Sequence, residues 1–357
     1  MNFSNSLIQW YLNHKRDLPW RNTQNPYLIW LSEIILQQTR VAQGTPYYMN
    51  FTNAFPTVFD LANATEEQVL KLWQGLGYYS RARNLHKTAQ YIAFECNGVF
   101  PNTYSELIKL KGVGEYTAAA IASFSFDEVV PVVDGNVFRV LARYFDIETD
   151  ISQSSAKKEF TALAVELISQ KSPAIFNQAI MEFGALQCVP KNPNCSECVF
   201  NSSCLALKKN KINQLPVKNK KTKVTKRYFN YLIYIDNHGK TPIRKRTEKG
   251  IWHNLYEFPI LETLTTISDS ELVKMIQENQ LFSNTISSIT LLNSDAIVHK
   301  LSHQYLTIKF WRISVLGHIS GGLEYDDLIK HPFPIVIYNF IENNFNFNQK
   351  NNCTFGH

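Results

Sequence analysis

The sequence predicts a mostly α-helical N-terminal domain that carries a cysteine-rich loop, followed by a small α/β domain. Apolar residues recur at helical spacing through the first part of the chain, for example in "PYLIWLSEIILQQTRV" and "AKKEFTALAVELISQ". Farther along, "RYFNYLIYIDNHGK" alternates aromatic and β-branched residues before a turn signal, which is typical of a strand entering a hairpin. A chain of 357 residues is long enough for two domains and a linker.

Changes in composition indicate where the domains begin and end. We expect the helical domain at residues 1–205 and a basic linker at 206–227, because "KKNKINQLPVKNKKTKVTKR" holds nine Lys or Arg residues and no acid. Repulsion between like charges keeps such a segment extended, either as a simple tether or as a contact for a phosphate backbone. The α/β domain is expected at 228–345, with a helix in "SDSELVKMIQEN" and a strand in "LTIKFWRISVLG", and a frayed tail at 346–357.

Composition and charge narrow the class of protein. Hydrophobic residues make up 45% of the chain, which is enough for packed cores and excludes a disordered protein. The net charge of +6 permits a polyanionic partner without requiring one. The N-terminal sequence lacks the pattern of a signal peptide, and no apolar run has the length of a membrane span. We therefore expect a cytoplasmic protein with no membrane partner. We also expect it to act as a monomer.

Four of the six cysteines lie close together and predict a metal centre. They have the spacing C-x6-C-x2-C-x5-C and are Cys188, Cys195, Cys198 and Cys204. A cytosolic chain rarely uses disulfides, so such a cluster points to a metal. Zinc accepts four thiolates, but its ligands usually come in two close pairs, and the wider gaps here suit an iron–sulfur cubane better. Cys96 and Cys353 stand alone without a predicted role, and Cys96 is expected in the core.

A glycine turn between two predicted helices is a second candidate site. "TYSELIKL" and the Ala-rich "EYTAAAIASF" flank Gly112 and Gly114, in the form of a helix–hairpin–helix. Backbone N–H groups at such a turn bind a phosphate without reading sequence. Asp134 follows in "VVDGNV", where it is also a good N-cap for the helix "GNVFRVLARYF".

These motifs together resemble the endonuclease III superfamily of DNA glycosylases. The cysteine spacing, the preceding "MEFGALQC", the glycine turn and "VVDGNV" carry the resemblance. It implies that the loop at residues 188–204 holds a 4Fe–4S cluster and that Asp134 is catalytic. We place the neighbouring Asn136 in the catalytic set as well.

Several segments resemble more specifically the MutY-type adenine DNA glycosylases. They are "LPWR", "PYLIWLSEIILQQTRV", "LWQGLGYYSRARNL" and "VVDGNVFRVLAR", and the resemblance covers residues 16–337. It implies a double-stranded DNA substrate in which adenine lies opposite 8-oxoguanine or guanine and is flipped out of the duplex. It also implies that Glu33, in "SEIILQQT", protonates the adenine. Glu33 interrupts a largely apolar helix surface, and burial there would raise its pKa toward the range of a general acid.

The resemblance extends to contacts with the DNA. The implied adenine-pocket residues are Arg16, Trp20, Arg21 and Leu36. Those implied to touch the rest of the duplex are Gln38 and Tyr78 as wedges, Thr39 and Leu76 at the oxidised guanine, Gly112 and Gly114 at a phosphate, and Ser302 and His303 as a polar pair that reads the oxidised guanine. Core packing alone would also account for Trp20, Leu36 and Leu76.

Tyr116 separates two kinds of chemistry. Bifunctional relatives carry a Lys at this point of the hairpin, and its amine forms a Schiff base with the sugar before the strand is cut. A phenol does not form a Schiff base, so we expect base removal only and place Tyr116 in the catalytic set. The alternatives are an endonuclease III-like glycosylase and lyase that acts on oxidised pyrimidines, and a non-catalytic iron–sulfur DNA-binding protein. Tyr116 and the presence of the second domain disfavour the glycosylase and lyase. The presence of both Glu33 and Asp134 disfavours the non-catalytic protein.

The second domain resembles the Nudix-like domain of the same family. "GIWHNLYEFP" matches its Gly-hydrophobic segment, with Tyr256 in the place of the usual Trp, and "HKLSHQYL" contains Ser302 and His303, preceded by Leu301 where members often have a Phe. A working Nudix hydrolase needs the run G-x5-E-x7-R-E-x2-E-E, and none follows Gly250. We therefore expect a recognition module for oxidised guanine without hydrolase activity.

Overall fold

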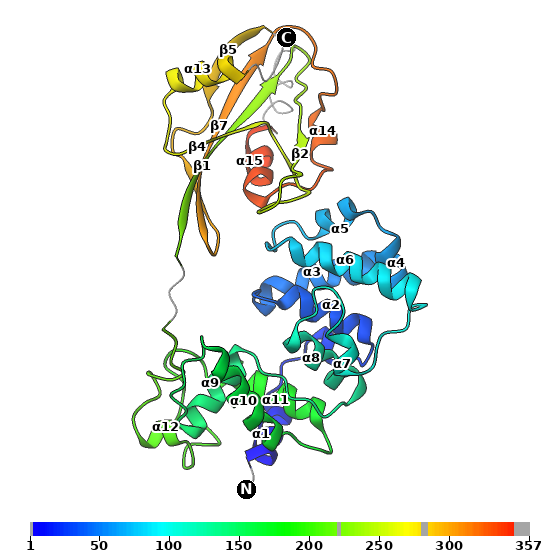
Figure 1. The fold of residues 1–357 in the computed structure, drawn as a ribbon, viewed down its shortest axis with the longest axis vertical. Coiled ribbons are helices and arrows are strands. Elements are labelled where there is room, and N and C mark those ends of the chain that lie inside the picture. Colours follow the sequence, from blue (N-terminus) through cyan, green and yellow to red (C-terminus); the bar gives the residue numbers. More distant parts are fainter. Residues whose placement is uncertain (1–2, 220–222, 280–284, 346–357) are drawn as a thin grey trace, which may run out of the picture. The chain divides into compact units, whose positions relative to one another are not determined.

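The computed structural model describes residues 3–219, 223–279 and 285–345 (Figure 1). By its contacts the chain divides into two compact units. The helical unit comprises Met1–Ala64 and Ser80–Lys220, and the C-terminal unit comprises Thr65–Tyr79 and Lys221–His357. The segment Thr65–Tyr79 therefore belongs with the C-terminal unit, although residues of the helical unit flank it in the chain. The predicted tail at 346–357, which includes Cys353, lies outside the described residues, as do positions 220–222 of the predicted linker.

The described part of the helical unit consists of helices and loops (Figure 1). Short Pro, Gly and Asn loops separate the helices, as their composition predicts. The elements are α1 (Phe3–His14), the 3-10 turn η1 (Pro19–Arg21), α2 (Pro26–Leu36), α3 (Val41–Ala54), α4 (Val58–Asn63), α6 (Ser80–Gln90), the π-helical segment η2 (Tyr91–Glu95), α7 (Tyr104–Leu107), α8 (Glu115–Phe126), α9 (Gly135–Phe145), α10 (Ser154–Leu167), α11 (Pro173–Leu186) and α12 (Leu205–Lys208).

One core of the helical unit lies between α1, α9, α10 and α11, and it also anchors the cysteine loop. Phe200 comes from that loop and is buried in the same cluster as residues of these four helices. Its ring stacks on Phe3 with centroids 4.9 Å apart and meets the edge of Phe183 at 5.3 Å. Aromatic contacts of this kind add to the stabilisation from burial alone. The loop at 188–204 is therefore packed onto the helical core.

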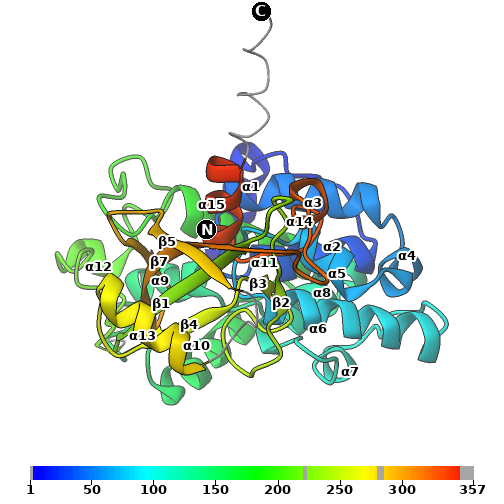
Figure 2. The same ribbon diagram turned by 90° about the horizontal axis from the view of Figure 1, so that it is seen from above.

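The C-terminal unit is built on a mixed five-stranded sheet. β1 (Thr225–Ile235) pairs in parallel with β7 (Gln304–Val315), and the two lie side by side in Figures 1 and 2. β4 (Ile260–Thr263) joins the other edge of β1, while β5 (Ile286–Leu291) and β6 (Ile297–Lys300) pair antiparallel with β7. A separate two-stranded ribbon joins β2 (Arg244–Lys245) to β3 (Tyr256–Glu257). The helices are α5 (Glu66–Leu72), α13 (Asp269–Asn279), α14 (Tyr325–Leu328) and α15 (Ile335–Phe345).

Both faces of the central strands are covered by helices. Alternate residues of a strand point to opposite faces, and here both sets include buried apolar residues. Trp311 on β7 belongs to a core cluster that includes Leu272 of α13. Phe310, the next residue on the other face, stacks on Phe340 of α15 with centroids 3.7 Å apart. The prediction of a small α/β domain after a mostly helical one is confirmed.

The turn predicted after β1 is present, but it does not make a hairpin. The Asp236 N–H bonds to the Lys240 carbonyl at 3.1 Å, which reverses the chain. The next strand, β2, pairs with β3, because both edges of β1 are already occupied by β4 and β7. No helix in the described ranges combines the length and apolar character needed to cross a membrane.

Candidate active site

Glu33 lies on α2, a helix whose residues are buried on nearly every side. Asn25 caps this helix by accepting a hydrogen bond from the Tyr27 N–H at 2.9 Å, and Pro26 takes the first helical position, where its missing N–H has no cost. The apolar residues around Glu33 pack into the core, so the helix carries the carboxyl group inward and leaves it 7% exposed. An acidic side chain therefore stands in a hydrophobic setting.

The environment of Glu33 raises its pKa to about 7. Burial is the largest cause because it disfavours the charged form, and the negative charge of Asp134 acts in the same direction. A hydrogen bond from the Tyr116 hydroxyl and the positive charge of Arg21 oppose the shift. Near neutral pH, Glu33 is therefore present in comparable protonated and ionised amounts, as a general acid requires.

Asp134 is the N-cap of α9. Its carboxylate accepts hydrogen bonds from the backbone N–H groups of Asn136 and Val137, both at 2.8 Å, and from the Asn136 side-chain amide at 2.7 Å. Burial raises the pKa of Asp134, and these hydrogen bonds, with the charge of Arg139, oppose the rise. Three hydrogen bonds hold the carboxylate in one orientation.

Asn136, in the first turn of α9, is in turn held by Arg139, which also bonds to α11. Arg139 donates a hydrogen bond from Nη2 to the side-chain oxygen of Asn136 at 2.8 Å and another to the Gly184 carbonyl at 2.6 Å. A Cβ added at Gly184 would lie 2.6 Å from the Cβ of Asn136, which is closer than real contacts allow. The glycine in "MEFGALQC" therefore lets α11 approach the start of α9.

Tyr116 occupies the first turn of α8, directly after the glycine turn. Burial, followed by the negative charges of Glu33 and Asp134, raises its pKa well above 10, so it remains a neutral phenol. It lines the same cleft as Glu33, Asp134 and Asn136, a cleft with a volume of about 680 Å³. The fold thus brings the four residues predicted to be catalytic to one place in the helical unit.

The two glycines of the turn have different requirements. Gly112 has a φ of +79°, and a Cβ there would lie 2.7 Å from the Cβ of Asn84, so both its conformation and its surroundings favour glycine. Gly114 is the N-cap of α8 with a φ of −90°, and a Cβ there would meet open space. The N–H groups in the first turn of α8 have no partner within the helix, which is the geometry that binds anions.

Two predicted pocket residues, Arg16 and Arg21, are held by a carboxylate absent from the sequence-based set. Glu182 on α11 is 1% exposed and accepts paired hydrogen bonds from each guanidinium, at 2.8 and 2.6 Å from Arg16 and at 2.8 and 2.7 Å from Arg21. Burial alone would raise the pKa of Glu182, but these bonds outweigh it and lower the pKa to about 2. An acid inside the apolar run "AIMEFGAL" was the available signal.

The other predicted pocket residues also reach the cleft. Trp20 is 8% exposed and meets the edge of Tyr48 with centroids 5.2 Å apart, so it has a packing role as well. Leu36 ends α2, and it lines the cleft together with Trp20 and Thr39.

The remaining predicted DNA contacts are not part of this cleft. Gln38 is exposed and has a φ of +56°, an uncommon backbone conformation for a residue other than glycine. Tyr78, with a φ of +47°, lies in the C-terminal unit together with Leu76, which is buried. Ser302 and His303 are exposed after β6, and the hydroxyls of Tyr78 and Ser302 are in hydrogen-bond contact.

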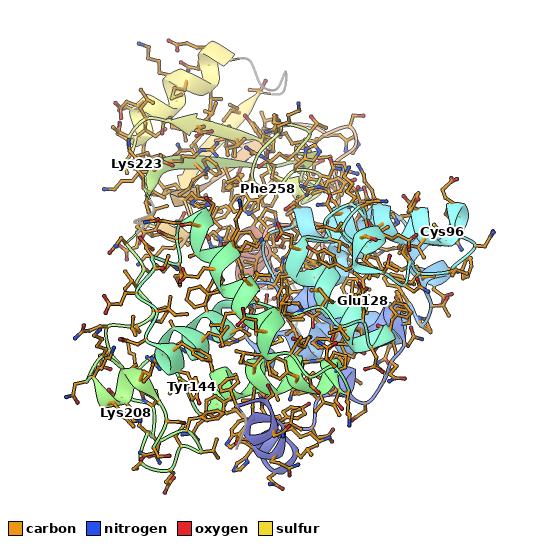
Figure 3. All side chains as sticks on the ribbon, turned by 60° about the horizontal axis from the view of Figure 1, so that its bottom comes forward. Cys96, Glu128, Tyr144, Lys208, Lys223 and Phe258 are labelled. Atoms are coloured by element: carbon orange, nitrogen blue, oxygen red, sulfur yellow. The ribbon has the colours of Figure 1, made fainter. Side chains whose placement is uncertain are left out.

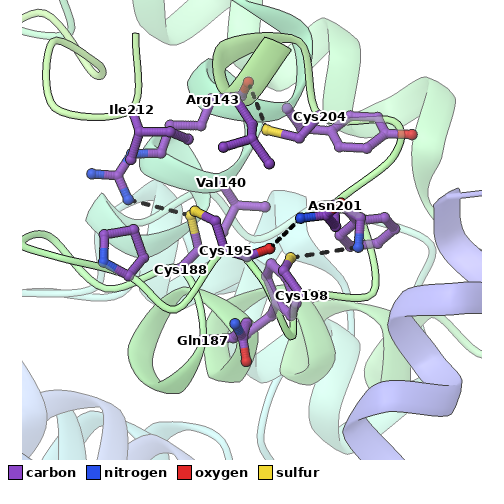
Figure 4. A pocket seen from close by; sticks show the side chains of 14 residues that line it. Val140, Arg143, Gln187, Cys188, Cys195, Cys198, Asn201, Cys204 and Ile212 are labelled. Atoms are coloured by element: carbon purple, nitrogen blue, oxygen red, sulfur yellow. Dashed lines mark hydrogen bonds between the residues drawn. The ribbon is translucent and has the colours of Figure 1, made fainter. Parts of the chain in front are cut away.

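The four clustered cysteines line one small cavity, shown in Figure 4. Buried Arg143 donates to Cys188 Sγ at 3.4 Å and to the Val189 and Pro190 carbonyls at 2.8 and 3.1 Å. The Phe200 N–H points at Cys198 Sγ at 3.4 Å. Within the described ranges, no three His, Cys, Asp or Glu side chains are placed so that they could hold one metal ion.

Cys96 lies apart from this cavity. Figure 3 shows it away from Tyr144, a residue that borders the cavity, within the helical unit. It is half-buried after η2 and forms a hydrogen bond with Tyr91, so the core position expected from the sequence is only partly realised.

Comparisons with known proteins show the family to which this chain belongs. Residues 31–166 match the family model of the HhH-GPD superfamily base excision DNA repair protein, and residues 230–343 match that of the NUDIX domain. An adenine DNA glycosylase of Buchnera aphidicola subsp. Baizongia pistaciae is 37% identical, over 91% of both chains. The chain belongs to the adenine DNA glycosylase family. The adenine DNA glycosylase of Mus musculus is 33% identical over 88% of this chain and 70% of the mouse protein.

Solved structures support the fold of this adenine DNA glycosylase family member. A thermostable thymine-DNA glycosylase superposes with a TM-score of 0.53 and 28% identity, covering 58% of this chain and 95% of the other. Endonuclease III in a trapped covalent complex with DNA gives a TM-score of 0.51 at 22% identity, which shows the shared fold. Glu33, Tyr116 and Asp134 fall inside the matched HhH-GPD region, whereas the cysteines at 188–204 lie outside both matched regions.

Proposed function

We propose that this protein removes adenine from double-stranded DNA in which the adenine lies opposite 8-oxoguanine or guanine, and leaves an abasic site. The observation that carries the proposal is the buried Glu33, with a pKa raised to about 7, in one cleft with Asp134 and Tyr116. Two carboxyl groups in different environments are what an acid and a charge stabiliser require. Membership of the adenine DNA glycosylase family supports adenine as the base.

In the proposed reaction Glu33 acts as the acid. It transfers its proton to a ring nitrogen of the flipped adenine, and the N-glycosidic bond breaks with its electron pair going to the base. Asp134, whose carboxylate is oriented by three hydrogen bonds, stabilises the positive charge that develops on the sugar. Glu33, now ionised, accepts a proton from water as the water oxygen bonds to the sugar carbon.

Tyr116 limits the reaction to base removal. Its hydroxyl supports Glu33 by a hydrogen bond, and it brings no amine to the sugar. Without an amine there is no Schiff base and no strand cleavage by that route. The abasic site is therefore the product that leaves the enzyme.

Glu182 has a positioning role toward the adenine pocket in this proposal. The paired bonds to Arg16 and Arg21 fix both guanidinium planes at the rim of the cleft. Fixed donors lose little entropy when a base arrives. Trp20 and Leu36 supply apolar surface against the flipped ring.

Exposed backbone groups and side chains make the proposed contacts with the rest of the DNA. The first turn of α8 after Gly112 and Gly114 receives a phosphate. Gln38 and Tyr78 carry left-handed backbone conformations, which occur preferentially at functional sites, and support a role as wedges in the base stack. Thr39 and Leu76 face the oxidised guanine, and Ser302 and His303 read its polar edge.

The cysteine cavity is proposed to hold a 4Fe–4S cluster through Cys188, Cys195, Cys198 and Cys204. The donor set fits, because four thiols face one cavity and both Arg143 and the Phe200 N–H point at sulfur, as donors do around such clusters. When bound, the cluster would cross-link the loop through four Fe–S bonds. Zinc remains the rival metal, and measurement of iron and acid-labile sulfide in the purified protein separates the two.

Adenine release under single-turnover conditions tests the function. The substrate is a duplex with one adenine opposite 8-oxoguanine, and Asp134→Asn is expected to lower the rate roughly a hundredfold or more while DNA binding persists. Release at the wild-type rate would show that Asp134 has another role. Borohydride trapping of the wild-type protein on DNA, or release of an oxidised pyrimidine, would favour the glycosylase and lyase alternative.

A further inference from the structure

The chain leaves the helical unit for one short excursion. Thr65–Tyr79 belongs to the C-terminal unit, and Ser80 begins α6 in the helical unit again. Thr65 starts α5 with a capping box in which its side chain and that of Gln68 satisfy each other's backbone N–H groups. After α5, residues 75–79 form a loop that contains both Leu76 and Tyr78.

The first turn of α5 is hydrogen-bonded to the β2–β3 ribbon and to the loop that connects β2 to β3. Glu67 accepts hydrogen bonds from Lys245 Nζ at 3.0 Å and from the Tyr256 hydroxyl at 2.7 Å. Glu66 accepts another from the side-chain amide of Asn254. The Tyr256 hydroxyl is therefore one of the groups that hold α5.

The last turn of α5 is bonded to the segment between α14 and α15. Lys71 Nζ donates to the Ile329 carbonyl at 2.6 Å and the His331 carbonyl at 3.3 Å, and it lies 4.4 Å from the centroid of the Tyr338 ring. Burial lowers the pKa of Lys71, although Glu342 opposes the change. Gln74 accepts a hydrogen bond from the Phe333 N–H at 3.0 Å. Both ends of α5 are therefore fixed within the C-terminal unit.

The loop that follows is braced by its own side chains. Trp73 donates from its indole to the Gly77 carbonyl at 3.0 Å, and the Gly75 N–H bonds to the Tyr79 hydroxyl at 3.3 Å. Tyr78 remains 45% exposed, with its hydroxyl against that of Ser302. A braced loop follows the helix to which it is attached, so the position of Tyr78 depends on how α5 is held.

We propose that Glu67, Lys71 and Gln74 are positioning residues for recognition of the base opposite the adenine. They fix α5, and through it Tyr78, so that Tyr78 and Ser302 present one continuous surface to that base. The inference rests on the proposed function, because it assigns the same surface to 8-oxoguanine. It predicts that loosening α5 reduces the preference for adenine opposite 8-oxoguanine over adenine opposite guanine, without a change in the chemical step.

Single-turnover adenine release on the two duplexes, over a range of enzyme concentrations, tests the proposal in the full-length protein. Lys71→Met removes the donor of the two carbonyls, and Gln74→Leu removes the acceptor of the Phe333 N–H. In each variant we expect the preference for the 8-oxoguanine duplex over the guanine duplex to fall about tenfold. The change should appear in the apparent dissociation constants, while the maximal rates stay the same. Gln74→Glu keeps an acceptor oxygen and is expected to retain the wild-type preference. Lys274→Met is the matched control, because Lys274 lies on α13 with 77% of its side chain exposed.

The two hypotheses fail in different ways. If the wild type releases adenine equally from both duplexes, the proposed reading of 8-oxoguanine is wrong and the positioning role falls with it. If the wild type discriminates and both Lys71→Met and Gln74→Leu discriminate equally well, only the positioning role is overturned. A variant that loses its melting transition is replaced by Glu67→Gln, which keeps the volume of the side chain. Combining Gln74→Leu with Ser302→Ala should cause no further loss, since both act on one surface, and additive losses would contradict the proposal.

Discussion

The Tyr116 hydroxyl donates a hydrogen bond to Glu33 in the cleft of the helical unit. The two residues are 83 positions apart in the sequence and come from α2 and α8. The bond favours the ionised carboxylate, so it moderates the rise in the pKa of Glu33 that burial causes. The pKa of Glu33, the proposed proton donor, therefore stays close to neutral pH.

Removal of this hydroxyl should therefore shift the pH dependence of adenine release. In Tyr116→Phe the ionised form of Glu33 loses its hydrogen bond, so the pKa of Glu33 rises above about 7 and the acidic form persists to higher pH. The decline of the single-turnover rate on the alkaline side should move upward in pH. Tyr91→Phe, on the half-exposed tyrosine after α6, is the control and should leave the profile in place. Identical profiles for Tyr116→Phe and the wild type would contradict the assignment.

Ionisation of Glu33 should lower the free energy of unfolding as the pH rises. Its pKa is about 7 in the folded protein against about 4.5 in the unfolded chain, so the folded state holds the proton more tightly. The contribution of Glu33 to stability is fully present below pH 4.5 and is lost as the pH rises to 7, by about 3 kcal/mol for a shift of this size. Glu33→Gln removes the titration. Chemical denaturation should show the variant to be more stable than the wild type at pH 8 and nearly equal at pH 4.5, while adenine release is lost. An equal difference at both pH values would argue against a buried, titrating Glu33.

Glu182 should matter for both stability and the adenine pocket. Glu182→Gln leaves two partly buried guanidinium groups without their carboxylate, and breaking a buried ion pair from one side typically costs about 3–5 kcal/mol. Glu148→Gln removes an exposed partner of Lys211 and should cost less than about 1 kcal/mol. Denaturation measures the first effect, and single-turnover release measures the expected loss of activity. Equal stability of the two variants would show that the paired bonds contribute little.

The cysteine cavity offers a matched pair of variants. Cys198→Ser removes one of the four thiols that line the cavity, whereas Cys96→Ser alters a half-buried thiol elsewhere in the helical unit. We expect iron and acid-labile sulfide to fall sharply in Cys198→Ser and to stay at the wild-type level in Cys96→Ser. Loss of iron in both variants, or zinc in place of iron in the wild type, would contradict the proposed cluster.

Some of these features could be read from short stretches of sequence. The four cysteines lie within 17 residues, so their spacing alone indicates a shared site. Asp134 caps α9 through the N–H groups of the next residues, and Thr65 caps α5 in the same local way. Local hydrogen bonds depend on neighbouring positions, and the sequence states those directly.

Other features depend on contacts between distant parts of the chain. Glu182 accepts a hydrogen bond from Arg16, which lies 166 positions away in the sequence. The residues near either position do not indicate which residue is the partner. The strand after β1 could not be paired correctly, because the edges of β1 are taken by strands that come later. The membership of α5 in the C-terminal unit has the same origin, since Lys71 finds its carbonyl partners 258 and 260 positions away.

The sequence by itself therefore determined the helical character of the first domain, the α/β character of the second and the cysteine loop, because periodicity, caps and spacing are local properties. The family resemblance, carried by short motifs, implied the residues to seek in the cleft. Only the tertiary structure decided that Glu33 is buried beside Tyr116 and that Glu182 binds both Arg16 and Arg21. It also decided that α5 is hydrogen-bonded within the C-terminal unit. Burial and long-range pairing set these outcomes, and both come from the packing of segments that the sequence keeps far apart.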